Sequence, residues 1–195
     1  MQISGRLVIV AMFVLAISMA AGAWLYQYSY SRRSAEFWGE SSRLIGKSPE
    51  LQFLVLESTP AEGDASGDDP TNAVAGRPVT DYHDLRNEKG LIHLRHVFIQ
   101  DDNFSWGARQ VEPAASTRDW AYALRFVEGP SEQVVLLGRD FKVLGKLSTD
   151  GKQVDVLPCP RIATPLQRYL TDVGALKPKA KSDAEPTVAA ESAAR

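Results

Sequence analysis

Residues 7–26 read LVIVAMFVLAISMAAGAWLY, an apolar run without a charged side chain, and this run decides how the rest of the chain is organised. A bilayer core about 30 Å thick is crossed by about 20 apolar residues as an α-helix, which satisfies every backbone hydrogen bond within the segment. The run therefore predicts a membrane-spanning helix. Its exit is typical of a membrane–water boundary, with Arg32 and Arg33 following four aromatic residues, Trp24, Tyr26, Tyr28 and Tyr30.

A cleaved signal peptide is the alternative interpretation of this segment. Arg6 precedes the apolar core, and residues 18–20 and 21–23 both resemble small-residue cleavage sites. A signal-anchor is favoured because the apolar run continues past both sites into Trp24 and Leu25. The membrane side stays open: the Lys and Arg residues after the run favour a cytoplasmic C-terminal part, whereas a signal-anchor with its short basic end inside favours the opposite.

Length, charge and cysteine content narrow the class of protein. The chain has 195 residues, which leaves enough for one domain beside the span and the termini. A net charge of −2 gives no basic surplus to neutralise phosphates, so nucleic acid is not an expected partner. The single cysteine, Cys159, excludes an intrachain disulfide and a paired-cysteine metal site, and we expect it to be buried.

Three parts are expected along the chain. Residues 1–32 form the anchor, residues 33–176 an α+β domain, and residues 177–195 a disordered tail without an aromatic residue. Within the domain, residues 58–78 are rich in Gly, Pro, Ala and Ser and hold a group of acidic side chains, which predicts a disordered acidic loop. The acidic spacing does not match a calcium-binding EF-hand loop.

Helical patterns flank that loop. Apolar residues at helical spacing over residues 33–45 predict a juxtamembrane helix that ends at Gly46 and Pro49. Continuity with the span and a break at Gly39 are both compatible with this pattern. We expect its apolar stripe to pack on its own domain, with lipid or a second copy as the alternatives. A second apolar arc predicts a helix over residues 88–101.

Alternating and apolar stretches predict a small antiparallel sheet. Six strands are expected, the last four forming a meander: residues 51–57, 79–86, 120–127, 133–137, 141–147 and 154–157. A helix with Thr164 as its cap and Pro165 at its first position closes the domain and ends at Gly174. The expected fold class is α+β: an N-terminal transmembrane helix followed by a small antiparallel meander sheet packed with two or three helices.

His93 and His96 are the candidate metal ligands. Three residues apart on a helix, they face the same way, and a shell of nitrogen and oxygen ligands would be completed from His83, Asp84, Asp101 or Asp102. Exposed surface histidines are the simpler interpretation, since the spacing lacks the glutamate of an HExxH motif and both lie on the polar face. Acid–base work by either histidine is a further alternative.

Arg95 lies within the apolar arc of the same helix. A half-buried guanidinium needs a carboxylate or carbonyl partner, and Asp81, Asp84 or Asp119 are candidates for an ion pair. Four aromatic residues are expected to belong to the core, with a pocket lining as the alternative: Phe104, Trp106, Trp120 and Tyr122.

No catalytic motif accompanies these residues, since the sequence contains no GxSxG elbow, P-loop, GxGxxG or kinase motif. Beside the N-terminal span, the chain contains two distinctive stretches. They are GLIHLRHVFIQDDNFSW at 90–106, and WAYALRF followed by VVLLGRDFKVLG within 120–145. Together they resemble uncharacterised single-span bacterial membrane proteins without an assigned activity. The resemblance implies a bacterial origin and helices on a small antiparallel sheet, and it implies no site residues.

Two functions follow as hypotheses. The first is a non-enzymatic accessory or scaffolding protein of a membrane complex, single-pass in the bacterial inner membrane and without a cofactor. It would contact the lipid bilayer through residues 7–26 and bind a protein partner or a second copy of itself. The second is a membrane-tethered metal-binding protein or enzyme that uses His93 and His96.

Overall fold

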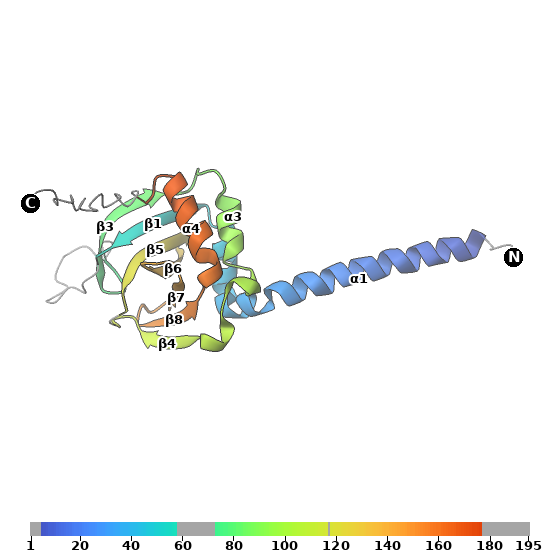
Figure 1. Cartoon of the computed structure of the whole chain (residues 1–195), viewed down its shortest axis with the longest axis horizontal. Helices are drawn as coiled ribbons and strands as arrows, with labels where there is room; N and C mark the ends of the chain where they lie inside the picture. The colour runs from blue at the N-terminus through green and yellow to red at the C-terminus, as the bar shows by residue number, and fades with distance from the viewer. Residues whose placement is uncertain (1–4, 58–72, 117, 177–195) are drawn as a thin grey trace, which may run out of the picture.

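A long N-terminal helix projects from a domain in which short helices lie against one curled antiparallel sheet (Figure 1). The computed structural model describes residues 5–57, 73–116 and 118–176. It confirms the predicted α+β class, a long apolar helix followed by an antiparallel sheet with helices. The predicted tail at 177–195 lies outside the described residues, as do residues 58–72 of the predicted acidic loop.

The N-terminal helix joins the predicted span and the predicted juxtamembrane helix into one element. Helix α1 runs over Gly5–Trp38, and its part Gly5–Tyr26 is long and apolar enough to cross a membrane and is wholly unburied. The helix stops where Gly39 adopts a φ of 53°, in the left-handed region that favours glycine. A 3₁₀ turn, η1 (Gly39–Ser41), and the short helix α2 (Ser42–Lys47) follow, so the predicted break at Gly39 is confirmed.

The sheet has eight strands in the order β2-β3-β1-β5-β6-β7-β8-β4, and all of its neighbouring strands are antiparallel. The predicted four-strand meander is its consecutive part β5-β6-β7-β8. The strands are β1 (Glu50–Leu56), β2 (Ala73–Val74), β3 (Arg77–Asp84), β4 (Gln110–Pro113), β5 (Trp120–Glu128), β6 (Ser131–Gly138), β7 (Val143–Leu147) and β8 (Gln153–Pro158).

Both edges of the sheet differ from the prediction. The expected loop over 58–78 ends early, because Ala73–Val74 and the start of β3 form a hairpin. Its turn uses Ala75 and Gly76 at φ values of 51° and 75°, the positive pair that a tight hairpin favours. Strand β4 was not expected, since QVEP shows no apolar alternation and its residues are mostly exposed at the edge beside β8.

Two helices also have different bounds from those predicted. Helix α3 covers only Leu91–Val97 of the expected 88–101, because Gly90 before it is left-handed at φ 86° and Gln100 after it is extended. Helix α4 covers Pro160–Asp172, beginning earlier than expected. Pro160 takes the first position assigned to Pro165, which lies inside the helix instead.

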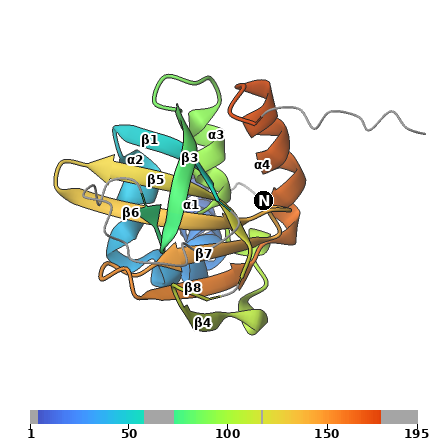
Figure 2. The same cartoon turned by 90° about the vertical axis from the view of Figure 1, so that its left-hand side faces the viewer.

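Hydrophobic side chains are buried on both faces of the sheet. The larger cluster joins one face to the ends of α1 and α2, to α3 and to α4; the smaller one, around Trp120 and Leu136, lies on the other face. Seen along α1, the strands lie in front of α2 and α3, with α4 along one side (Figure 2). A register shift between Trp120 and Tyr122 explains why these two residues join different clusters despite their spacing. Phe104 and Trp106 pack with the larger cluster, as expected for core aromatics.

Replacement of Gly145 in β7 by alanine should destabilise the domain. An added Cβ would lie 2.9 Å from Trp120 Cη2 and closer still to Val154 Cγ1, both in the smaller cluster. Overpacking of this kind costs about 1–3 kcal/mol, which a denaturant titration would measure. Gly107→Ala is the matched control, because an added Cβ there meets no atom within 4 Å. Equal stability of the two variants would contradict the expected overpacking.

Candidate functional site

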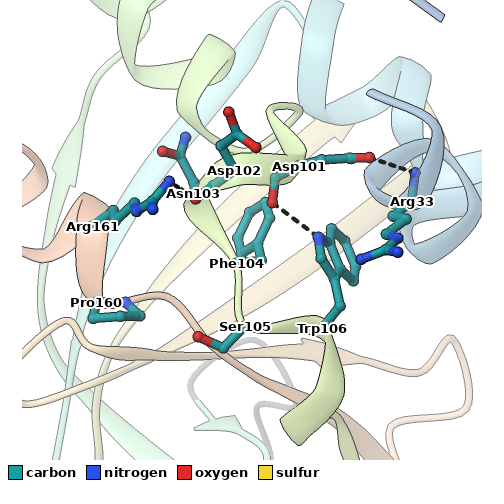
Figure 3. Close-up of a pocket in the computed structure, with 9 residues that line it drawn as sticks. All are labelled: Arg33, Asp101, Asp102, Asn103, Phe104, Ser105, Trp106, Pro160 and Arg161. Atoms are coloured by element: carbon teal, nitrogen blue, oxygen red, sulfur yellow. Dashed lines mark hydrogen bonds between the residues drawn. The ribbon is translucent and has the colours of Figure 1, made fainter. Parts of the chain in front are cut away.

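The described residues form a polar pocket of about 450 Å³ where the base of α1 meets the rest of the domain (Figure 3). Its walls come from α1, from the 3₁₀ turns η3 (Asp101–Asn103) and η4 (Trp106–Ala108), and from the first turn of α4. The lining includes Arg33, Asp101, Phe104, Trp106 and Arg161. The pocket therefore joins segments that are more than 60 residues apart in the sequence.

Asp101 fixes α1 to the domain. Its carboxylate accepts the backbone N–H groups of Arg33 and Ser34 at 2.9 and 2.7 Å, and the Ser34 hydroxyl at 2.8 Å. These N–H groups lie within α1, so the carboxylate joins the side of the helix to η3. The backbone carbonyl of Asp101 accepts the indole N–H of Trp106 at 2.9 Å (Figure 3).

Further hydrogen bonds hold the last turns of α1. The Trp38 indole donates to the Phe98 carbonyl at 2.6 Å, and the Ser34 hydroxyl to the Ile99 carbonyl at 2.5 Å. The Lys146 ammonium donates to the carbonyls of Phe37 and Trp38 at 2.8 and 3.1 Å. Burial lowers the pKa of Lys146, while a positive charge at the carbonyl end of a helix is favourable.

Two guanidinium groups lie on opposite sides of the pocket (Figure 3). Arg161 donates to the Asp102 carbonyl at 2.9 Å, and Arg33 is exposed. Both oxygens of the Asp101 carboxylate accept hydrogen bonds from α1. The geometry indicates a structural junction between helix and domain.

The structure places His93 and His96 on the exposed surface of α3. In the described part of the chain, no three His, Cys, Asp or Glu side chains gather in a way that could hold a metal. The other proposed ligands lie elsewhere: Asp101 holds α1, and His83 Nε2 is 3.8 Å from a Glu88 carboxylate oxygen. Metal binding by His93 and His96 stays a prediction, which metal analysis of the purified chain would test.

Arg95 has carbonyl partners instead of the expected carboxylate. Its guanidinium donates to the carbonyls of Gly46 and Ser48 at 3.3 and 2.6 Å. Asp84 pairs with Arg86 and Asp119 with Arg139, at 2.8 Å in each case. The predicted ion pair of Arg95 with Asp81, Asp84 or Asp119 is therefore wrong, because carbonyls at the end of α2 are its partners instead.

Cys159 is buried, as expected, and should be unreactive in the folded protein. Burial raises the pKa of its thiol to about 12, so the thiol is neutral at pH 8 and little of the reactive thiolate is present. We expect iodoacetamide at pH 8 to alkylate Cys159 only after denaturant is added. Mass spectrometry of the treated chain measures the alkylation. Ser105→Cys, at an exposed position, is the positive control. Rapid alkylation of Cys159 in the native chain would contradict this burial.

Comparison of the chain with protein-family models, with curated proteins and with solved structures finds no match. The interpretation of the site therefore rests on its own geometry. Sequence reasoning considered Asp101 only as a metal ligand and did not identify Ser34 or Lys146. Their partners lie 65–109 residues away along the chain, and no local pattern marks them.

Proposed function

We propose that this chain is a non-enzymatic, single-pass accessory or scaffolding protein anchored in a bacterial inner membrane. The observation that carries the proposal is the division of α1: Gly5–Tyr26 is apolar and unburied, whereas Phe37 and Trp38 of the same helix are buried in the domain core. A bilayer would cover the apolar side chains of an unburied helix of this length. The shared helix then holds the domain close to the membrane surface.

The base of α1 supports a structural role for the junction. Its polar groups are used in hydrogen bonds between helix and domain, through Asp101, Ser34 and Lys146. A firm connection between span and domain suits a protein that presents a surface to partners in or beside the membrane. The metal-binding alternative gains no third ligand among the described residues.

Anchoring is tested by the mass of the chain recovered from membranes. The full-length mass is expected, and a mass lacking the first ~20–23 residues would mean a processed signal peptide. A variant with Ala20→Leu and Ala23→Leu, which removes both small-residue sites, is the matched control. It should have the same full-length mass as the parent chain. Protease accessibility of a C-terminal tag, in intact and in permeabilised cells, then gives the membrane side of the domain.

The accessory role is tested by purification in mild detergent after cross-linking in cells. We expect a complex larger than the monomer, containing a second copy or a partner protein. A chain that is strictly monomeric and free of partners under both conditions would contradict the scaffolding proposal, while leaving the anchor itself untouched.

A further inference from the structure

A groove of about 310 Å³ separates α3 from the connection between α2 and β1. Its lining includes Arg86, Leu91, Ile92, Arg95, His96 and Ile99. Both α2 and α3 lie at the end of the domain from which α1 leaves (Figure 1). The groove therefore belongs to the part of the domain nearest to the candidate span.

The groove lies near enough to the proposed span to reach the lipid headgroups. The Ile99 carbonyl accepts a hydrogen bond from Ser34 of α1, so one wall of the groove contacts α1 at that residue. Ser34 follows Tyr26 by eight residues, which is about 12 Å along a helix. Each headgroup layer is about 5–7 Å thick, and electrostatic attraction extends about 8–10 Å further at physiological salt.

The charged or titratable residues that line the groove are Arg86, Arg95 and His96. Arg86 is paired with Asp84 at 2.8 Å, so its charge is offset. Arg95 donates to two carbonyls and has no carboxylate partner among the described residues. A guanidinium stays charged and retains its affinity for an anion in this position.

Apolar side chains accompany these cations. Ile92 is 82% exposed, the most exposed of the large hydrophobic residues in the described part of the chain. Leu91 and Ile99, on either side of it, are half-buried. An exposed apolar residue next to a cation without a carboxylate partner is a combination found where protein helices contact anionic bilayer surfaces.

We propose that this groove is a contact site for the anionic headgroups of the bilayer, with a lipid phosphate beside Arg95 and Ile92 in the interfacial layer. This inference rests on the proposed anchoring, which brings the groove to the membrane. The contact sets the domain against the lipid surface, with α3 toward the headgroups.

Amide hydrogen exchange of the full chain in lipid nanodiscs tests the proposal. Nanodiscs of phosphatidylcholine alone are compared with nanodiscs that also contain phosphatidylglycerol. We expect exchange in residues 91–99 to slow severalfold with the anionic lipid, while exchange in β4, residues 110–113, stays unchanged. Ile92→Ser and Arg95→Gln should each remove the effect, and Ile92→Ser should do so without unfolding because the side chain is exposed.

Arg43→Gln is the matched control, since Arg43 is an exposed arginine paired with Glu128 away from the groove. It should retain the protection. Equal exchange in both kinds of nanodisc, or protection that survives in Ile92→Ser, would overturn the proposal. Protection by inorganic phosphate in phosphatidylcholine nanodiscs would replace it with a small-anion site, and protection only when a partner protein is present would replace it with a protein interface.

Recovery of the chain with the nanodisc is checked before exchange begins. A chain that separates from the nanodisc contradicts the anchoring, whereas a retained chain without protection of α3 contradicts only the lipid contact. The two failures are therefore distinguished in one sample.

Discussion

Trp38→Ala should strongly destabilise the domain, although the residue lies in the same helix as the candidate span. Trp38 is fully buried, its ring packs edge-on against Phe37 and Phe98, and its indole donates to the Phe98 carbonyl. Truncation of a buried tryptophan costs about 3–5 kcal/mol, a large part of the roughly 5–15 kcal/mol that stabilises a typical domain. Denaturant unfolding of the domain in detergent measures the loss.

Trp24→Ala is the matched control for this experiment. Trp24 belongs to the same helix but is 66% exposed within the apolar part, so its loss should leave the unfolding of the domain unchanged. Similar denaturation midpoints for the two variants would show that α1 does not contribute to the core.

The same packing limits where a soluble fragment can begin. A fragment starting at Lys47 lacks four core residues, Phe37, Trp38, Leu44 and Ile45, and should not fold. A fragment starting at Arg32 keeps them together with Ser34, and it should give a cooperative unfolding transition. Circular dichroism of both fragments decides the matter.

Asp101→Ala should loosen the junction between α1 and the domain. The substitution removes the acceptor of the backbone N–H groups of Arg33 and Ser34, and it removes one of the two acceptors, beside the Ile99 carbonyl, that share the single Ser34 hydroxyl proton. Since hydrogen bonds to a charged group contribute about 1.5–3 kcal/mol each and are not additive, we expect a loss of about 2–4 kcal/mol. Amide exchange at residues 33 and 34 should rise together with the loss of stability.

Asp102→Ala tests whether the loss of stability in Asp101→Ala comes from the contact between Asp101 and α1. Asp102 is the exposed neighbour, and among the described residues its carboxylate accepts no hydrogen bond from α1. We expect it to keep the stability of the parent, and Asp101→Asn, which retains one oxygen acceptor, to fall between the two. An alanine at 101 that behaves like an alanine at 102 would contradict the role assigned to the carboxylate.

The elements that follow from local pattern were predicted well. The meander β5–β8 follows from apolar alternation and from its turn at Asp150-Gly151, and the stop of α1 follows from Gly39. The strand β4 lacked such a pattern, because an exposed edge strand needs little apolar character. Strand β4 is recognised as a strand only from its pairing with β8 in the structure.

The parts that were missed depend on contacts distant in sequence. Beyond the end of α3, the Phe98 and Ile99 carbonyls accept hydrogen bonds from Trp38 and Ser34 of α1, and no local pattern marks these contacts. Arg95 was recognised as needing a partner, but the carbonyls at the end of α2 could not be chosen over a carboxylate from spacing alone. The junction at Asp101 was invisible for the same reason, since its importance comes from a segment 67 residues earlier.

Continuity of α1 from Gly5 to Trp38 couples the proposed span to the orientation of the domain. Bilayers of different thickness change the tilt of a span that crosses them. A helix stiff along its whole length passes that tilt directly to the domain. The Asp101 carboxylate and the buried Trp38 side chain hold the final turns of the helix to the domain, so the domain turns together with the span. The orientation of the domain toward its surroundings therefore depends on the thickness of the membrane in which the chain is placed.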